Sequence, residues 1–209
     1  MTLSFMDRFR PRPATPLPIV FDGLAQVRAY WEALRSAGQL PGRAALDPRG
    51  LSGMLDRVFL AERIGHGLAQ IRVAGSGLAD FAGTDLRGLP LSCLFAGESR
   101  PLLAQSVERV FAEPALAELD LGSDRGKQGQ TIARLLLLPL ADDAGNRTLL
   151  GALSFVPEAH TASKFQVLAR REERVAPLAV VPVSPTFAPP ESGVPLRRRG
   201  HLTLVHFNE

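Results

Sequence analysis

Apolar residues recur every three or four positions in two stretches of the chain, which is the spacing of a helix with one buried face. The first stretch starts after Asp22 and stops before Gly38, residue types that favour the start and end of a helix, and it predicts a helix over 23–37. The second starts at Ser99 and stops near Pro114, and it predicts a helix over 99–113. The apolar positions of the first helix are Leu24, Val27, Tyr30, Trp31 and Leu34.

Five further stretches are rich in apolar residues and are bounded by turn residues, as strands are. Two of them flank the hairpin turn at 65–67, and short helical turns are expected after Asp47-Pro48 and over 78–82, the second closed by Gly83. This order indicates an α+β fold whose five-stranded antiparallel sheet has helices on one face and an N-terminal flanking helix. The expected strands span 58–64, 68–74, 116–121, 131–138 and 149–156.

The two ends of the chain differ in composition from its middle. Four prolines within residues 1–21 favour an extended arm, and seven within residues 157–209 break regular structure there, apart from a candidate helix over 163–174. The sequence therefore predicts an arm over 1–21, a folded domain over 22–156, and a proline-rich, partly basic tail over 157–209.

The formal net charge of +3 resides in those ends, because residues 22–155 contain 14 basic and 15 acidic side chains. A neutral central region argues against nucleic-acid binding, which needs a concentrated basic face. The arginine triplet at 197–199 and the apolar segment after it keep one alternative open, namely a tail that binds nucleic acid or a membrane surface. No apolar run approaches the roughly 18 residues of a membrane span, and no secretory signal is present, so we expect a cytoplasmic protein.

Several motifs of the central region are similar, in their order and spacing, to a bacterial family of PAS-type domains first catalogued as a domain of unknown function. This resemblance implies a sensory or regulatory domain that acts in signalling by binding a small ligand, a protein partner, or both. Since the tail holds no kinase or helix-turn-helix motif, we expect a stand-alone regulator. The matching elements are Trp31, "LPGRAALDP" at 40–48, "IRVAGSGL" at 71–78, "GTDLRG" at 83–88, "LLLPL" at 136–140 and "LLGALSF" at 149–155.

The resemblance also implies where a ligand would lie, between the inner face of the sheet and the segment 78–95. Glycines at 75, 83 and 88 would let that segment fold back over the strands. The ligand should be small and largely apolar, because Arg72 is the one nearby charge, and it could instead pair with Asp80 or Asp85. In the alternative interpretation these apolar residues are simply core. The candidate ligand contacts are Phe59, Ile71, Arg72, Val73, Leu78, Phe81 and Leu86.

The flanking helix is the expected homodimer interface, since Tyr30 and Trp31 offer a large apolar area. The alternative is that Trp31 packs only within its own subunit. The predicted interface residues are Val27, Tyr30, Trp31 and Leu34.

The sequence argues against the cofactors that related domains use. Cys93 lacks the neighbouring Asn and Arg of the flavin photoadduct motif, and the helix over 99–113 lacks the histidine that would hold haem. The four histidines, at 66, 160, 201 and 206, form no metal pair on a regular element, and Ser76 and Ser154 have no histidine partner. The acidic pair at 142–143 suits a solvated turn. We therefore predict no metal and no catalytic residues; an enzyme that uses the pocket is the weaker alternative.

Overall fold

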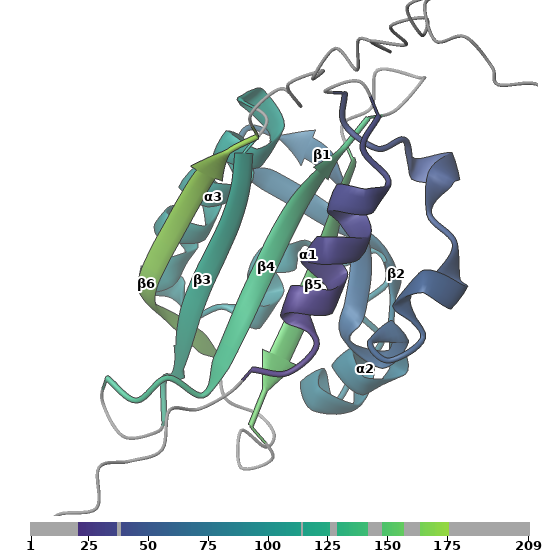
Figure 1. Ribbon diagram of the computed structural model, residues 1–209. Coiled ribbons are helices and arrows are strands. Elements are labelled where there is room, and N and C mark those ends of the chain that lie inside the picture. Colours follow the sequence, from purple (N-terminus) through teal and green to yellow (C-terminus); the bar gives the residue numbers. More distant parts are fainter. Residues whose placement is uncertain are drawn as a thin grey trace, which may run out of the picture. The chain divides into compact units, whose positions relative to one another are not determined.

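The computed structural model describes residues 21–36, 39–113, 115–125, 129–141, 148–156 and 164–175. Within these ranges six antiparallel strands form one sheet in the order β2-β1-β5-β4-β3-β6 (Figure 1). The α+β class is confirmed, with six strands instead of the expected five. The strands are β1 (Val58–Gly65), β2 (Leu68–Ala74), β3 (Ala115–Ser123), β4 (Ala133–Leu140), β5 (Thr148–Phe155) and β6 (Phe165–Arg174).

The central strands β4 and β5 are buried on both faces, because their side chains are apolar at consecutive positions. Leu135 and Leu137 of β4 point into one core, whereas Leu136 and Leu138 point into the other. A strand with apolar side chains on both faces needs other elements packed on both sides of the sheet. Two separate regions of the chain provide these elements.

The helix α1 (Leu24–Ala33) covers one face and lies across β4 and β5 (Figure 1). Val27 and Trp31 are fully buried there, and the Trp31 Nε1–H donates to the Pro139 carbonyl at 2.8 Å. The short helices η3 (Pro48–Leu51) and η4 (Leu55–Arg57) follow, with η3 capped by the Asp47 carboxylate, which accepts from the Arg49 N–H at 2.9 Å. The predicted helical turn after Asp47-Pro48 is confirmed.

The opposite face is covered by α2 (Ser76–Ala82), η5 (Leu91–Leu94) and α3 (Arg100–Ala112). Gly83 ends α2 with a φ of 66°, a conformation that favours glycine, as expected from the sequence. The predicted cap of the first helix is wrong, because the N-cap of α1 is Gly23, with no side-chain cap bond, instead of Asp22. Ser99 is the N-cap residue of α3 as predicted, but its hydroxyl makes no cap bond and instead accepts from the Val167 N–H at 3.0 Å.

The candidate helix over 163–174 is wrong: Phe165–Arg174 is the strand β6, hydrogen-bonded to β3 along its length. Residues such as Leu168 and Ala169 suit a helix, but the free edge of β3 offers a ladder of backbone hydrogen bonds that local helix propensity does not outweigh. The sheet thus continues beyond residue 156, the end of the predicted domain. The arm before residue 21 and the tail after residue 175 lie outside the described residues.

The ring of Phe59 lies directly on the backbone of Gly151 in the neighbouring strand β5, and a Cβ at residue 151 would overlap that ring. We expect Gly151→Ala to lower the free energy of unfolding by about 1 to 3 kcal/mol through overpacking. Chemical denaturation measures this change in the free energy of unfolding. Gly97→Ala is the matched control, since an added Cβ there meets nothing within 4 Å, and equal effects of the two substitutions would contradict this packing.

Candidate functional site

The interior between the sheet and the segment 78–95 is where the sequence predicts a ligand. Four predicted residues, Phe59, Ile71, Leu78 and Leu86, do meet there, but the remaining cavity is only about 10 Å³. That is about the volume one water needs, and all ten lining residues are apolar, so none offers the polar side-chain group that a buried water requires. The other lining residues, which the sequence analysis missed, are Leu91, Leu94, Phe95, Leu135, Leu153 and Phe165.

Phe165, the first residue of β6, fills much of this interior. Its side chain is 1% exposed, and its ring stacks on that of Phe81 with centroids 5.0 Å apart and planes inclined by 1°. Phe95 approaches the same ring at 5.9 Å. Phe81 is therefore a core residue that contacts Phe165 and Phe155, and it does not line the small cavity. The alternation of Phe165 and Val167 with polar residues was the sequence signal that could have revealed an inward-facing strand here.

Arg72 and Val73 do not face the interior. The pairing of β2 with β1 shifts at this point, so Arg72 is the extra residue of a β-bulge. Ile71 is consequently fully buried, whereas Arg72 is exposed and Val73 is 53% exposed. The Arg72 guanidinium pairs with Glu62 on β1 at 2.6 Å, and neither aspartate suggested by the sequence is its partner there. Val73 therefore points away from the interior in which the ligand was expected, because strict alternation of side chains fails at a bulge.

The apolar residues of α1 pack against the sheet of the same chain. Val27 and Trp31 have no exposed surface, while Tyr30 and Leu34 are half-buried. The Tyr30 hydroxyl accepts from the Asp47 N–H at 2.7 Å and so holds the following segment against the helix. Of the four predicted dimer contacts, Val27 and Trp31 are therefore inaccessible to a second copy while α1 stays on the sheet.

A carboxylate on α3 holds the β1–β2 hairpin. Glu108 accepts from the Gly67 N–H at 2.8 Å and from the Arg63 guanidinium at 2.5 Å, and His66 Nε2 lies 4.0 Å away. Burial opposes ionisation of this carboxyl, but the Gly67 N–H, Arg63 and His66 together outweigh it and lower the pKa of Glu108. The hairpin is thus fixed to α3 by the ionised form of one side chain.

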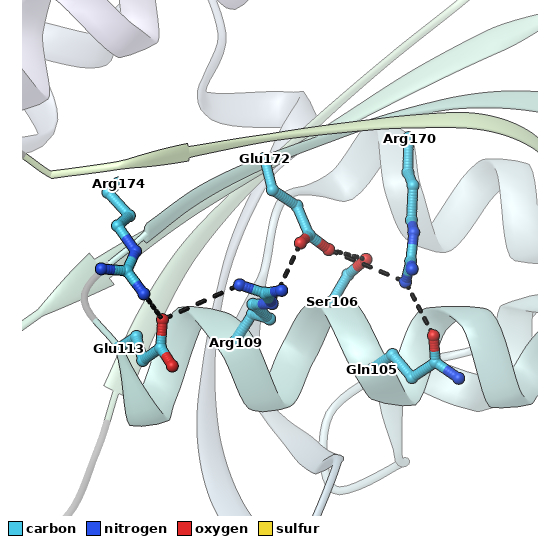
Figure 2. A network of polar contacts seen from close by, with 7 residues as sticks. All are labelled: Gln105, Ser106, Arg109, Glu113, Arg170, Glu172 and Arg174. Atoms are coloured by element: carbon cyan, nitrogen blue, oxygen red, sulfur yellow. Dashed lines mark hydrogen bonds and ion pairs between the residues drawn. The ribbon is translucent and has the colours of Figure 1, made fainter.

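The same helix holds β6 through a chain of polar contacts, shown in Figure 2. Glu172 accepts from the buried Ser106 hydroxyl at 3.0 Å and pairs with Arg109 at 3.3 Å. Further along, Arg174 pairs with Glu113 at 2.7 Å. An open groove of about 380 Å³ runs beside these groups, lined by His66, Gln105, Glu108, Arg109, Ala112, Glu113 and Arg170.

Comparison with known families identifies this architecture. The family model described as "PAS domain" matches residues 21–154, which is more than half of the chain. The chain belongs to the PAS domain family. No match to a curated protein was found. PAS domains are sensory and signalling modules, and this is the functional class of the chain.

The match to the PAS family ends before β6 begins. The strand that carries Phe165 into the core therefore lies outside the matched region. This PAS domain closes its own interior with a residue from that additional strand.

Cys93 lies at the border of the PAS core and is half-buried. Burial raises the pKa of its thiol, and the nearby positive charges of Lys164 and Arg100 offset this only in part. The thiol is therefore held in its protonated, less nucleophilic form at neutral pH. The absence of a photoadduct or haem stays a prediction from the sequence.

Within the described ranges the PAS domain shows no cluster of three or more metal-ligating side chains, and no helix of the kind that spans a membrane. His66 is exposed in its hairpin turn, and Ser154 is buried in β5. The remaining histidines, the acidic pair at 142–143 and the arginine triplet at 197–199 lie outside the described residues.

Glu108→Gln should lower the stability of the PAS domain at neutral pH. Because the folded pKa of Glu108 lies below its ordinary value of 4.5, its ionised form stabilises the fold above about pH 4.5. That contribution is lost as the pH falls through the folded pKa. Urea denaturation of both proteins between about pH 7 and pH 3 should therefore show a difference that shrinks with acid. A difference that stays constant over this range would contradict the assigned role.

Proposed function

We propose that this PAS domain signals through protein–protein contact, including self-association, and works without a retained ligand. The observation that supports this most directly is the closed interior. Ligand pockets commonly enclose about 300 to 1,000 Å³ and combine apolar walls with a few polar groups. The interior of this domain leaves about 10 Å³ among apolar side chains. A ligand would have to displace Phe165 or its neighbours to enter.

The exposed apolar side chains support a specific contact surface. Six large ones are at least 37% exposed in the described part of the chain, and three of them belong to the β1–β2 hairpin. These three are Ile64, Leu68 and Val73. Since Val27 and Trp31 of α1 are fully buried, we infer that the self-association contact lies on this hairpin and not on the flanking helix. The hairpin thus carries half of the large exposed apolar side chains of the described residues, and exposed apolar surface is used in protein interaction sites.

Native mass spectrometry of the purified full chain tests both parts of this proposal. We expect the mass of two chains with no added small molecule. Ile64→Lys and Val73→Lys should shift the protein to one chain, because each places a charge in the contact. Leu102→Lys on α3 is the matched control, as Leu102 is also exposed and lies outside the hairpin, and it should leave the dimer intact. A stoichiometric small molecule on the wild-type protein would overturn the ligand-free mechanism, and a wild-type monomer would overturn self-association.

Removing the Phe165 ring should create the pocket that the wild-type protein lacks. Phe165→Ala is expected to cost about 3 to 5 kcal/mol of stability and to leave a dry apolar cavity. Benzene should then raise the melting temperature of this variant and not that of the wild-type protein. Gly151→Ala is the control for lost stability alone, since it overpacks the sheet and removes no side chain from the interior. If Phe165→Ala does not fold, Phe165→Leu gives a smaller cavity. Equal stabilisation of the wild-type protein by benzene would contradict a filled interior.

A further inference from the structure

The strand β6 consists of two parts that are held by different forces. Its first part, 165–167, is fixed by the buried Phe165 ring and by two backbone contacts. The Ala96 N–H donates to the Phe165 carbonyl at 3.0 Å, and the Val167 N–H donates to the Ser99 hydroxyl at 3.0 Å. These contacts attach the start of the strand to the core and to the beginning of α3.

The second part, 168–174, has no fully buried residue and is fixed to α3 by polar side chains (Figure 2). The Arg170 guanidinium donates to the Gln105 side-chain carbonyl at 2.9 Å. Glu172 is the most enclosed member, with its side chain 18% exposed between Ser106 and Arg109. All these partners are side chains of α3.

The opposite face of this second part is also held by charges. Arg171 pairs with Glu118 at 3.1 Å and with Asp120 at 2.9 Å, both on β3. Glu173 pairs with Arg28 of α1 at 2.6 Å. Every side chain from 170 to 174 is therefore bound to a polar group of the same chain, and the ladder to β3 adds backbone hydrogen bonds.

An irregularity separates the two parts. The register between β3 and β6 shifts between Asp120 and Leu121, where Leu168 is left as the extra residue. A bulge interrupts the ladder locally and bends the strand. It therefore provides a hinge at the point where apolar attachment gives way to ionic attachment.

We propose that residues 168–174 form a releasable clasp, which opens about the bulge at Leu168 while Phe165 stays in the core. Exposed ion pairs contribute little individually to stability, and salt screens them. The burial of an aromatic ring is not weakened by such screening. Opening frees the edge of β3 from Ala115 to Asp120. A free strand edge is a template for pairing with another strand. This device is independent of the self-association proposed above.

Amide hydrogen exchange on the full chain, followed by NMR at single residues, tests the clasp. Raising sodium chloride from about 0.1 M to about 1 M shortens the screening length from about 10 Å to about 3 Å. We expect the amides of 169–174 that bond to β3, together with their partners on β3, to exchange at least about threefold faster at high salt. The amides of Phe165, Val167, β4 and β5 should not change.

Glu172→Gln should produce the same local acceleration at low salt. Glu62→Gln is the matched control, because Glu62 also pairs with two arginines and its side chain is 19% exposed, against 18% for Glu172. The proposal would be overturned if the exchange rates of β6, like those of β4 and β5, were the same at low and at high salt. Acceleration of all three strands together in Glu172→Gln would also overturn it, since the strand would then open only with the whole domain. The salt measurement uses the unmodified protein and decides the question even if the variant does not fold.

Discussion

The burial of β4 and β5 on both faces is the constraint from which the rest of this structure follows. Leu135, Leu136, Leu137 and Leu138 are consecutive and all buried, so each face of the sheet must be covered over its centre. A sheet with one solvated face would leave every second one of these side chains in water. The chain meets the requirement with α1 on one side and with α2, η5 and α3 on the other. The N-terminal helix is thus a structural layer of the domain.

This two-sided cover limits how the PAS domain can function. The apolar side chains of α1 are used against the sheet, and the space on the other side is filled by Phe165. Among the described residues, the core beneath α2, η5 and α3 leaves a cavity of only about 10 Å³. In the mechanism we propose, signalling uses an exposed surface and a strand edge, namely the β1–β2 hairpin and the clasp of β6.

The helix α3 connects these two features. Its residue Glu108 holds the β1–β2 hairpin, and its residues Ser106 and Arg109, with Glu113 directly after the helix, hold β6. The apolar side of the same helix, with Leu103 and Val107, packs on the sheet. A shift of α3 would therefore alter both attachments together, because polar contacts on its outer side link elements that lie at opposite regions of the sheet.

The sequence alone determined the α+β class, five of the six strands and the helices α1 and α3, because apolar periodicity and turn residues are local signals. It also determined the turns at Asp47 and Gly83, where a single side chain or a positive φ sets the backbone. Only the tertiary structure decided what those elements do. Residues 163–174 were expected to form a helix, but 165–174 pair with the open edge of β3 instead. The bulge at Arg72 leaves Val73 exposed. Phe165, which is distant in sequence, fills the interior. Each of these outcomes depends on which strand lies beside which, and local periodicity does not reveal which distant segments pair.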